Sequence, residues 1–339
     1  MSWKPRIGIV VAIVLVAFGV TRLEQSRMDA SAAGANTAIG ASRIDGERLL
    51  QDVRTLSSPD FEGRLTGTRG SHKAQAFILR RFRELGLQPL VPRQNGPAAY
   101  EQPFAFISHS IKGLVVPGRS FRRTFNDATN LMGYVTGSAE PGRFTTVTAH
   151  YDHLGVRDGR VYPGADDNAS GVATLLAAAE YFTHHRPKRS ILFIAFDGEE
   201  EGLQGSTYFI AHPPVALSAV ALEISLDMIG RGDRGELVVA GTYQSPDLKA
   251  PLVEAARGRH LTLLFGHDRP WFRAGAVEDW THASDHGPFH DAGIPFLYFG
   301  VEDHPDYHRP TDIVDRIPRA FFLEAANLIV DALLAFDAR

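Results

Sequence analysis

Histidines and carboxylates crowd into one short stretch of the chain, TAHYDHLGVRDGRVYPGADDNASG. His150, Asp152 and His153 stand near its start, and Asp166 and Asp167 stand near its end. Carboxylates packed this closely repel one another, and burying them costs free energy that has to be compensated. The stretch is therefore either a solvated loop or the binding site of a cation.

The same residue types recur where other segments predict strands. Four apolar segments, FTTVTAH, RSILFIAF, VALEISLD and IPFLYF, each end in or lead into histidine or carboxylate. The first ends at His150 and the third at Asp227, while the second runs into DGEEEG and the fourth into VEDHPDYHRPTD. Open α/β sheets bind ligands at the carboxyl ends of their strands. We therefore expect these groups, together with Asp166 and Asp167, to converge on one site at that edge of the sheet.

Such a donor set suits two metal ions. Zn²⁺ takes histidine nitrogen and carboxylate oxygen, and two histidines with three carboxylates can hold two ions if one carboxylate bridges them. Paired ions about 3.5–4 Å apart polarise a carbonyl and deprotonate a bridging water. Co²⁺ and Mn²⁺ accept the same donors. Gly164 and Gly171 would let the backbone turn tightly around the acidic pair. Because the chain has no cysteine, thiolate sites, disulfides and thiol catalysis are excluded.

The elements that must position these residues follow from hydrophobic periodicity. Helices are predicted at residues 44–56, 71–87, 168–185, 203–212, 247–260 and 317–336. Their alternation with strands predicts an α/β fold, with a mixed, mostly parallel sheet covered by helices on both faces. Residues 90–130 are poorly patterned, with short strands expected near 112–116 and 131–136. We expect a single domain over residues 41–339.

The N-terminal segment, residues 1–40, is expected to be a signal peptide or membrane anchor followed by a tether. The apolar run at residues 7–20 follows two basic residues and has the length of a signal peptide, but it is short for a membrane span. ASAA at residues 30–33 offers a cleavage site. We therefore expect an exported protein, periplasmic or secreted, with the choice between cleavage and anchoring open. The net charge of -4 argues against nucleic-acid binding.

Five motifs, taken in order, resemble the co-catalytic di-zinc aminopeptidases: AHYDHLG, GADDNASG, AFDGEEEGLQGS, SLDMIGR and DYHRPTD. These enzymes are relatives of bacterial leucyl aminopeptidase, aminopeptidase Y, glutamate carboxypeptidase II and glutaminyl cyclase. The earlier LSSPDFEGRLTGTRG is similar to the family's N-terminal part, so the resemblance covers residues 44–335. It implies a phosphorylase/hydrolase-like three-layer α/β sandwich, two Zn²⁺ per chain and peptide substrates with a free N-terminus.

The resemblance also implies which residues would bind each zinc ion. His150 and Asp227 would hold one zinc ion, Glu200 and His308 would hold the other, and Asp167 would bridge them.

Three further roles come from the same motifs. Glu199 would be the general base that takes a proton from the bridging water and passes it to the leaving amine. Asp152 would fix the imidazole of His150. Tyr307 would hydrogen-bond the oxyanion. Glu201 has no role in this scheme.

Several residues allow a plainer interpretation. Asp166 could replace Asp167 as the ligand, or it could be a helix N-terminal charge. Tyr307 could serve packing alone. His153, His286 and His304 are expected to support ligands or line the substrate pocket rather than bind metal.

Other functions on the same scaffold stay open as alternatives. They are a carboxypeptidase, a glutaminyl cyclase and a metal-bound scaffold without activity. The cyclase is disfavoured because GEEEGLQGS is compact, where similar cyclases carry a tryptophan-containing insertion. The scaffold is disfavoured because Glu199 and all five ligands are present. Trp271, Phe272 and Trp280 could line a pocket for an apolar N-terminal residue. The sequence does not indicate an oligomeric state.

Overall fold

The computed structural model describes four stretches of the chain, residues 42–93, 96–108, 122–269 and 277–339. Within it, Ala41–Arg339 forms one compact unit. The expectations for the whole N-terminal segment 1–40, for the strand near 112–116, and for the pocket residues Trp271 and Phe272 fall outside the described residues.

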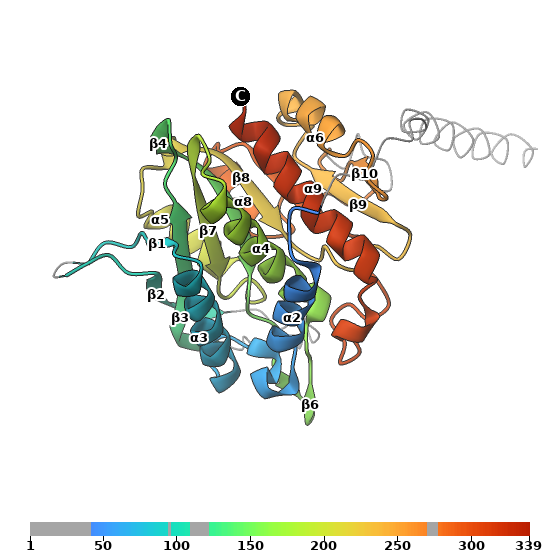
Figure 1. The fold of residues 1–339 in the computed structure, drawn as a ribbon. Coiled ribbons are helices and arrows are strands. Elements are labelled where there is room, and N and C mark those ends of the chain that lie inside the picture. Colours follow the sequence, from blue (N-terminus) through green and yellow to red (C-terminus); the bar gives the residue numbers. More distant parts are fainter. Residues whose placement is uncertain (1–41, 94–95, 109–121, 270–276) are drawn as a thin grey trace, which may run out of the picture. The chain divides into compact units, whose positions relative to one another are not determined.

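A large mixed sheet forms the centre of this unit (Figure 1). Its strand order is β1-β3-β7-β4-β8-β11-β9-β10, and β2 pairs with β3 at one side. The strands are β1 (Gln88–Pro89), β2 (Glu101–Ser108), β3 (Arg123–Val135), β4 (Glu140–His150), β7 (Arg189–Phe196), β8 (Val220–Leu226), β9 (Glu236–Ala240), β10 (Thr262–Phe265) and β11 (Phe296–Gly300). The central strands β7, β4, β8 and β11 run parallel, whereas β3 and β9 join them antiparallel. The predicted sheet type is confirmed.

Helices cover both faces of the sheet. They are α2 (Gly46–Leu56), α3 (Arg69–Glu84), α4 (Gly171–His184), α5 (Gln204–Ala211), α6 (Lys249–Ala255), α8 (His286–Asp291) and α9 (Arg319–Asp337). Helices α2, α3, α4 and α9 share one apolar core with the sheet, and α5 and α8 pack in a second core. Figure 1 shows the first four in front of the strands. The fold is the expected α/β sandwich.

Strand β7 shows why the sheet needs both layers. Side chains alternate across a strand, so a strand buried on both faces is apolar throughout. Ile191 and Phe193 lie in the core under α4, and Leu192 and Ile194 lie in the core under α5. Because both faces are closed, the carboxyl ends of the parallel strands are the places where polar side chains can gather.

The sequence analysis missed several elements, among them strand β2 and helix α8. Strand β2 lies at the side of the sheet, contains Pro103 and pairs with β3 across a bulge, so its alternation is weak. Helix α8 is six residues long, which is too short to show a helical period. Helix α4 starts at Gly171 rather than 168, because Ala165–Ser170 forms a separate wide turn. Across the described residues, no helix has the length and apolar character needed to cross a membrane.

Candidate metal centre

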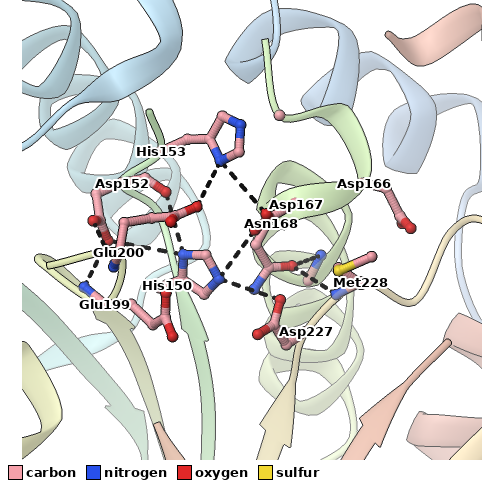
Figure 2. A network of polar contacts seen from close by, with 12 residues as sticks. His150, Asp152, His153, Asp166, Asp167, Asn168, Glu199, Glu200, Asp227 and Met228 are labelled. Carbon is pink, nitrogen blue, oxygen red and sulfur yellow. Dashed lines mark hydrogen bonds and ion pairs between the residues drawn. The ribbon is translucent and has the colours of Figure 1, made fainter. Parts of the chain in front are cut away.

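The predicted histidines and carboxylates come together at the carboxyl ends of the central strands. Strand β4 ends at His150, Asp227 directly follows β8, and Glu200 lies four residues beyond β7. The turn before α4 brings in Asp167. Figure 2 shows these side chains pointing into one space. The convergence expected from the positions of these residues at the strand ends is therefore present in the structure.

One group of donors surrounds His150. Its Nε2 atom lies 3.2 Å from Oδ1 of Asp227 and 3.5 Å from Oδ1 of Asp167. All three side chains are buried, and their ligand atoms lie within 4.8 Å of one another. A nitrogen and two carboxylate oxygens thus face one another at a spacing that a single ion can span.

A second group lies on the other side of Asp167. Nε2 of His308 lies 2.9 Å from Oδ2 of Asp167 and 3.3 Å from Oε1 of Glu200. Nδ1 of His153 lies 2.9 Å from the same Glu200 oxygen and 3.7 Å from Asp167 Oδ2. His153, Asp167 and Glu200 form a second set of ligand atoms within 4.8 Å of one another. Asp167 therefore faces both groups, one with each oxygen.

The donor set fits zinc on chemical grounds. Imidazole nitrogen and carboxylate oxygen are preferred zinc ligands, and buried carboxylates need a positive partner. Asp167, Glu200 and Asp227 are all buried, and histidines approach them from β4, the loop after it and the segment after β11. His153, which we expected to support a ligand, contacts Glu200 directly, an arrangement that would orient this carboxylate.

The structure separates the two adjacent aspartates. Asp166 points away from the cluster (Figure 2), accepts a hydrogen bond from the Gly230 amide at 2.7 Å and lies 3.2 Å from Nε2 of His304. Asp166 thus holds the chain after β8, and His304 pairs with it. His286 lies elsewhere, 2.7 Å from the Trp280 carbonyl oxygen, and burial lowers its pKa to about 3.

Asp152 contacts the turn after β7 as well as the His150 imidazole. Its carboxylate accepts hydrogen bonds from the amides of Glu199 and Glu200, at 3.1 and 3.3 Å. Nδ1 of His150 lies closer to the Asp152 carbonyl oxygen, at 3.2 Å, than to its carboxylate, at 3.8 Å. The residue therefore links the end of β4 to the turn after β7 as well as touching the imidazole.

Two supporting residues were not assigned from the sequence. The Asp312 carboxylate accepts the amides of Asp166 and Asp167 at 3.0 and 3.1 Å. The Asn168 side chain donates to the Leu226 carbonyl at 2.8 Å, just before Asp227. Asp312 belongs to DYHRPTD and Asn168 to GADDNASG, so their motifs were the available signal.

The glycines flanking the acidic turn are required by close approach, as expected. Gly164 has φ 56, and a Cβ there would clash with the Asp167 carbonyl oxygen and the His153 ring. Gly171 lies so near Asn168 and the Leu226 carbonyl that a Cβ would clash with both. The turn can therefore fold back over the strand ends only with glycine at both positions.

The profile of peptidase family M28 matches residues 130–333, more than half of the chain. The chain belongs to this family. The matched region includes all of the candidate ligands and ends inside α9. It leaves out the segment with α2 and α3.

One curated relative of this chain is an aminopeptidase. Aminopeptidase YwaD of Bacillus subtilis is 31% identical over 195 residues, which are 55% of this chain and 40% of the relative. This chain spans about half, or less, of the length of the curated relatives it matches.

Solved structures share the fold at lower identity. A zinc aminopeptidase from Bacillus subtilis superposes with a TM-score of 0.64 at 20% identity, covering 86% of this chain and 95% of the other. The Porphyromonas gingivalis glutaminyl cyclase superposes with a TM-score of 0.66 at 19% identity, covering 86% and 99%. An aminopeptidase and a cyclase thus share this fold about equally, so the fold alone does not select between the two activities.

Three predicted residues of this M28 chain remain, namely Tyr307, Trp280 and Glu199. The Tyr307 ring stacks on His308, with centroids 3.9 Å apart. Trp280 is 7% exposed and stacks on His267 at 3.7 Å, so little of its ring is available to line a pocket. Glu199 extends beside His150 in Figure 2. Its pKa lies well above the usual value, because the effect of burial outweighs the opposite effect of the nearby His150.

Proposed function

We propose that this M28 chain is a zinc-dependent aminopeptidase that removes N-terminal residues from peptides. His150 and Asp227 would hold one Zn²⁺, Glu200 and His308 would hold the other, and Asp167 would bridge them. The observation that carries the proposal is the position of Asp167, whose Oδ1 faces His150 and whose Oδ2 faces His308. A carboxylate with one oxygen toward each donor group is what a bridging ligand requires.

The chemistry follows from the position of Glu199. Zinc ions held in this cluster would polarise the scissile carbonyl and make a water molecule more acidic. Glu199 is not part of either donor group and lies beside them, with its amide fixed by Asp152. Because Glu199 lies outside both donor groups, its carboxylate could take the proton of the attacking water and return it to the leaving amine.

Two further residues would assist the reaction. Asp152 would hold Glu199 and Glu200 through their amides. Tyr307, stacked on His308, would offer its hydroxyl to the oxygen on which negative charge develops. Co²⁺ or Mn²⁺ could replace zinc because they accept the same donors.

The preference for a free N-terminus rests on the aminopeptidase relative at 31% identity. A carboxypeptidase, a cyclase and an inactive metal-bound scaffold are the competing functions, and the cyclase has a solved neighbour of the same fold. Incubation of the full chain and added zinc with free and end-blocked peptides, followed by mass spectrometry, separates them. We expect ladders trimmed from the free N-terminus and abolished by a chelator.

The other outcomes contradict the proposal in distinct ways. Trimming from the carboxyl end would indicate a carboxypeptidase, and loss of ammonia from N-terminal glutamine would indicate a cyclase. Intact peptides in the presence of bound zinc would indicate a scaffold.

Two expectations about the chain as a whole stay predictions. One is export through residues 7–20, and the other is a single peptidase domain over 41–339. Fractionation of cells with an antibody to the domain would test the export.

A further inference from the structure

The segment before α3 contains an arginine that is enclosed by the metal centre's own backbone. Arg64 ends the short helical turn Pro59–Arg64, inside the motif FEGR and outside the region matched by the M28 profile. Its side chain is 0% exposed, one of the largest fully buried side chains among the described residues. A buried guanidinium is costly unless its donors are satisfied, so its partners show what it holds together.

All of the partners are backbone carbonyl oxygens. Arg64 donates from Nε to Tyr151 at 2.8 Å, and from Nη1 to Leu56 at 2.7 Å and to Pro163 at 2.6 Å. It also donates from Nη2 to Gly164 at 2.9 Å. The fork thus makes four charge-assisted hydrogen bonds to three separate segments of chain.

Two of those segments carry two of the five proposed zinc ligands, His150 and Asp167. Tyr151 lies between His150 and Asp152, and Pro163 and Gly164 come just before Asp166 and Asp167. The guanidinium therefore joins the loop after β4 to the acidic turn before α4. These two segments have to keep a fixed spacing if His150 and Asp167 are to face the same ion.

Neighbouring residues show that the whole FEGRLTG segment is fitted to the centre. A Cβ on Gly63 would clash with the Tyr162 carbonyl oxygen, so the segment lies directly against the same loop. Thr66 donates to Oδ1 of Asp197 at 2.7 Å, at the start of the turn that carries Glu199. The segment therefore contacts the loop after β4, the start of the acidic turn and the loop after β7.

We propose that Arg64 is a positioning residue of the metal centre, holding the loops of His150 and Asp167 at the spacing that zinc binding needs. This inference rests on the proposed zinc site. Only arginine has a planar fork of five donors that can serve three segments at once, so lysine cannot replace it.

A competing role for Arg64 predicts the opposite sign. Its charge lies near Asp152, Asp167, Glu200 and Asp312, all of which favour the charged guanidinium. If charge balance were its role, removing the cation would raise the affinity for Zn²⁺, and Arg64→Lys would leave that affinity unchanged. If the carbonyl contacts matter, both Arg64→Gln and Arg64→Lys lower the affinity.

The experiment measures the zinc affinity of the full chain by competition with a chromogenic chelator, at a temperature where circular dichroism shows each variant folded. We expect Arg64→Gln and Arg64→Lys to weaken zinc binding by about 10- to 100-fold, the usual cost of losing a group that orients metal ligands. Arg81→Gln is the matched control. Arg81 is also buried, at 5% exposed, but it pairs with Asp52 between α3 and α2, away from the centre.

Each outcome decides the question. Unchanged affinity in both Arg64 variants, tighter binding by Arg64→Gln, or an equal loss in Arg81→Gln would overturn the positioning role. If Arg64→Gln does not fold, Arg64→Lys, which keeps the charge, gives the answer. A wild-type chain that binds no zinc would instead remove the proposed function itself, and with it the premise of the positioning role.

Discussion

Two clusters of the same residue types lie in the described part of the molecule, and they differ in what surrounds them. The first is the buried centre around Asp167. The second, which we call the surface cluster, consists of His282, His290 and Asp291, and its ligand atoms also lie within 4.8 Å of one another. Judged by residue type and spacing alone, both could hold a metal ion.

The surface cluster is satisfied without one. Nε2 of His282 lies 2.9 Å from Oδ1 of Asp291, and these side chains are 56% and 68% exposed. Water solvates both, so neither needs a further partner, and an exposed pair of this kind contributes little to stability. The His290 ring packs against Phe296. Nothing in this surrounding favours a bound ion over solvent.

The carboxylates of the buried centre are not solvated in this way, because they are enclosed by protein. Other residues, such as Asp312 and Asn168, form hydrogen bonds that hold the loops on which these carboxylates lie. Burial without water leaves like charges to be balanced by cations. The comparison teaches that burial and supporting contacts, rather than donor type, distinguish a metal site from a polar surface.

The largest effect is expected for Asp167→Ala. Because Asp167 faces both donor groups, the variant should lose both zinc ions and all measurable peptidase activity. Zinc content by inductively coupled plasma mass spectrometry checks the first, and peptide cleavage checks the second. Retention of two zinc ions by this variant would rule out the bridge, and retention of one would mean that Asp167 serves a single ion.

Glu199→Gln should affect activity while leaving the metal in place. Removing a general base costs about 10²- to 10⁴-fold in turnover, but the amide should not disturb either donor group. The measurements are the turnover number and the zinc content of the same preparation. Glu201→Gln, in the same run of glutamates, should change neither. Loss of zinc in Glu199→Gln would show that the roles of Glu199 and Glu200 are exchanged.

Asp312→Asn should weaken zinc binding without abolishing it. The substitution removes one of the two oxygens that accept the amides of Asp166 and Asp167, and such losses cost about 10-fold or more in metal affinity. Asp268→Asn is the control, since Asp268 is also buried and accepts two amides, those of Gly241 and Tyr243. Equal effects of the two variants on affinity would reduce Asp312 to a general structural role.

The smallest effect is expected at the surface cluster. His282→Ala removes an exposed ion pair, so zinc content and activity should stay at wild-type values and the free energy of unfolding should change by no more than about 0.5 kcal/mol. Zinc content and urea denaturation provide the measurements. A zinc ion lost on this substitution would show that the surface cluster binds metal and that the comparison above is wrong.

The edge of the sheet at which the candidate ligands meet was predictable, because several of them follow apolar runs in the sequence. His150 and Asp227 close apolar runs that become β4 and β8, and the carboxyl ends of parallel strands meet at one edge. Strand β2 and helix α8 were missed because an edge strand with a proline and a helix of fewer than two turns have no clear period. Their absence from the prediction did not move the site.

What the sequence by itself determined was the set of donors and the edge of the sheet at which they meet, since both follow from residue type and hydrophobic periodicity. Only the tertiary structure decided which of two adjacent aspartates faces the centre, with Asp166 turned to Gly230 and Asp167 turned to the histidines. It alone also brought Arg64 and Asp312 onto the same turn. The physical reason is that these contacts join segments far apart in the chain, several of them through a backbone atom, and no local pattern records such a partner.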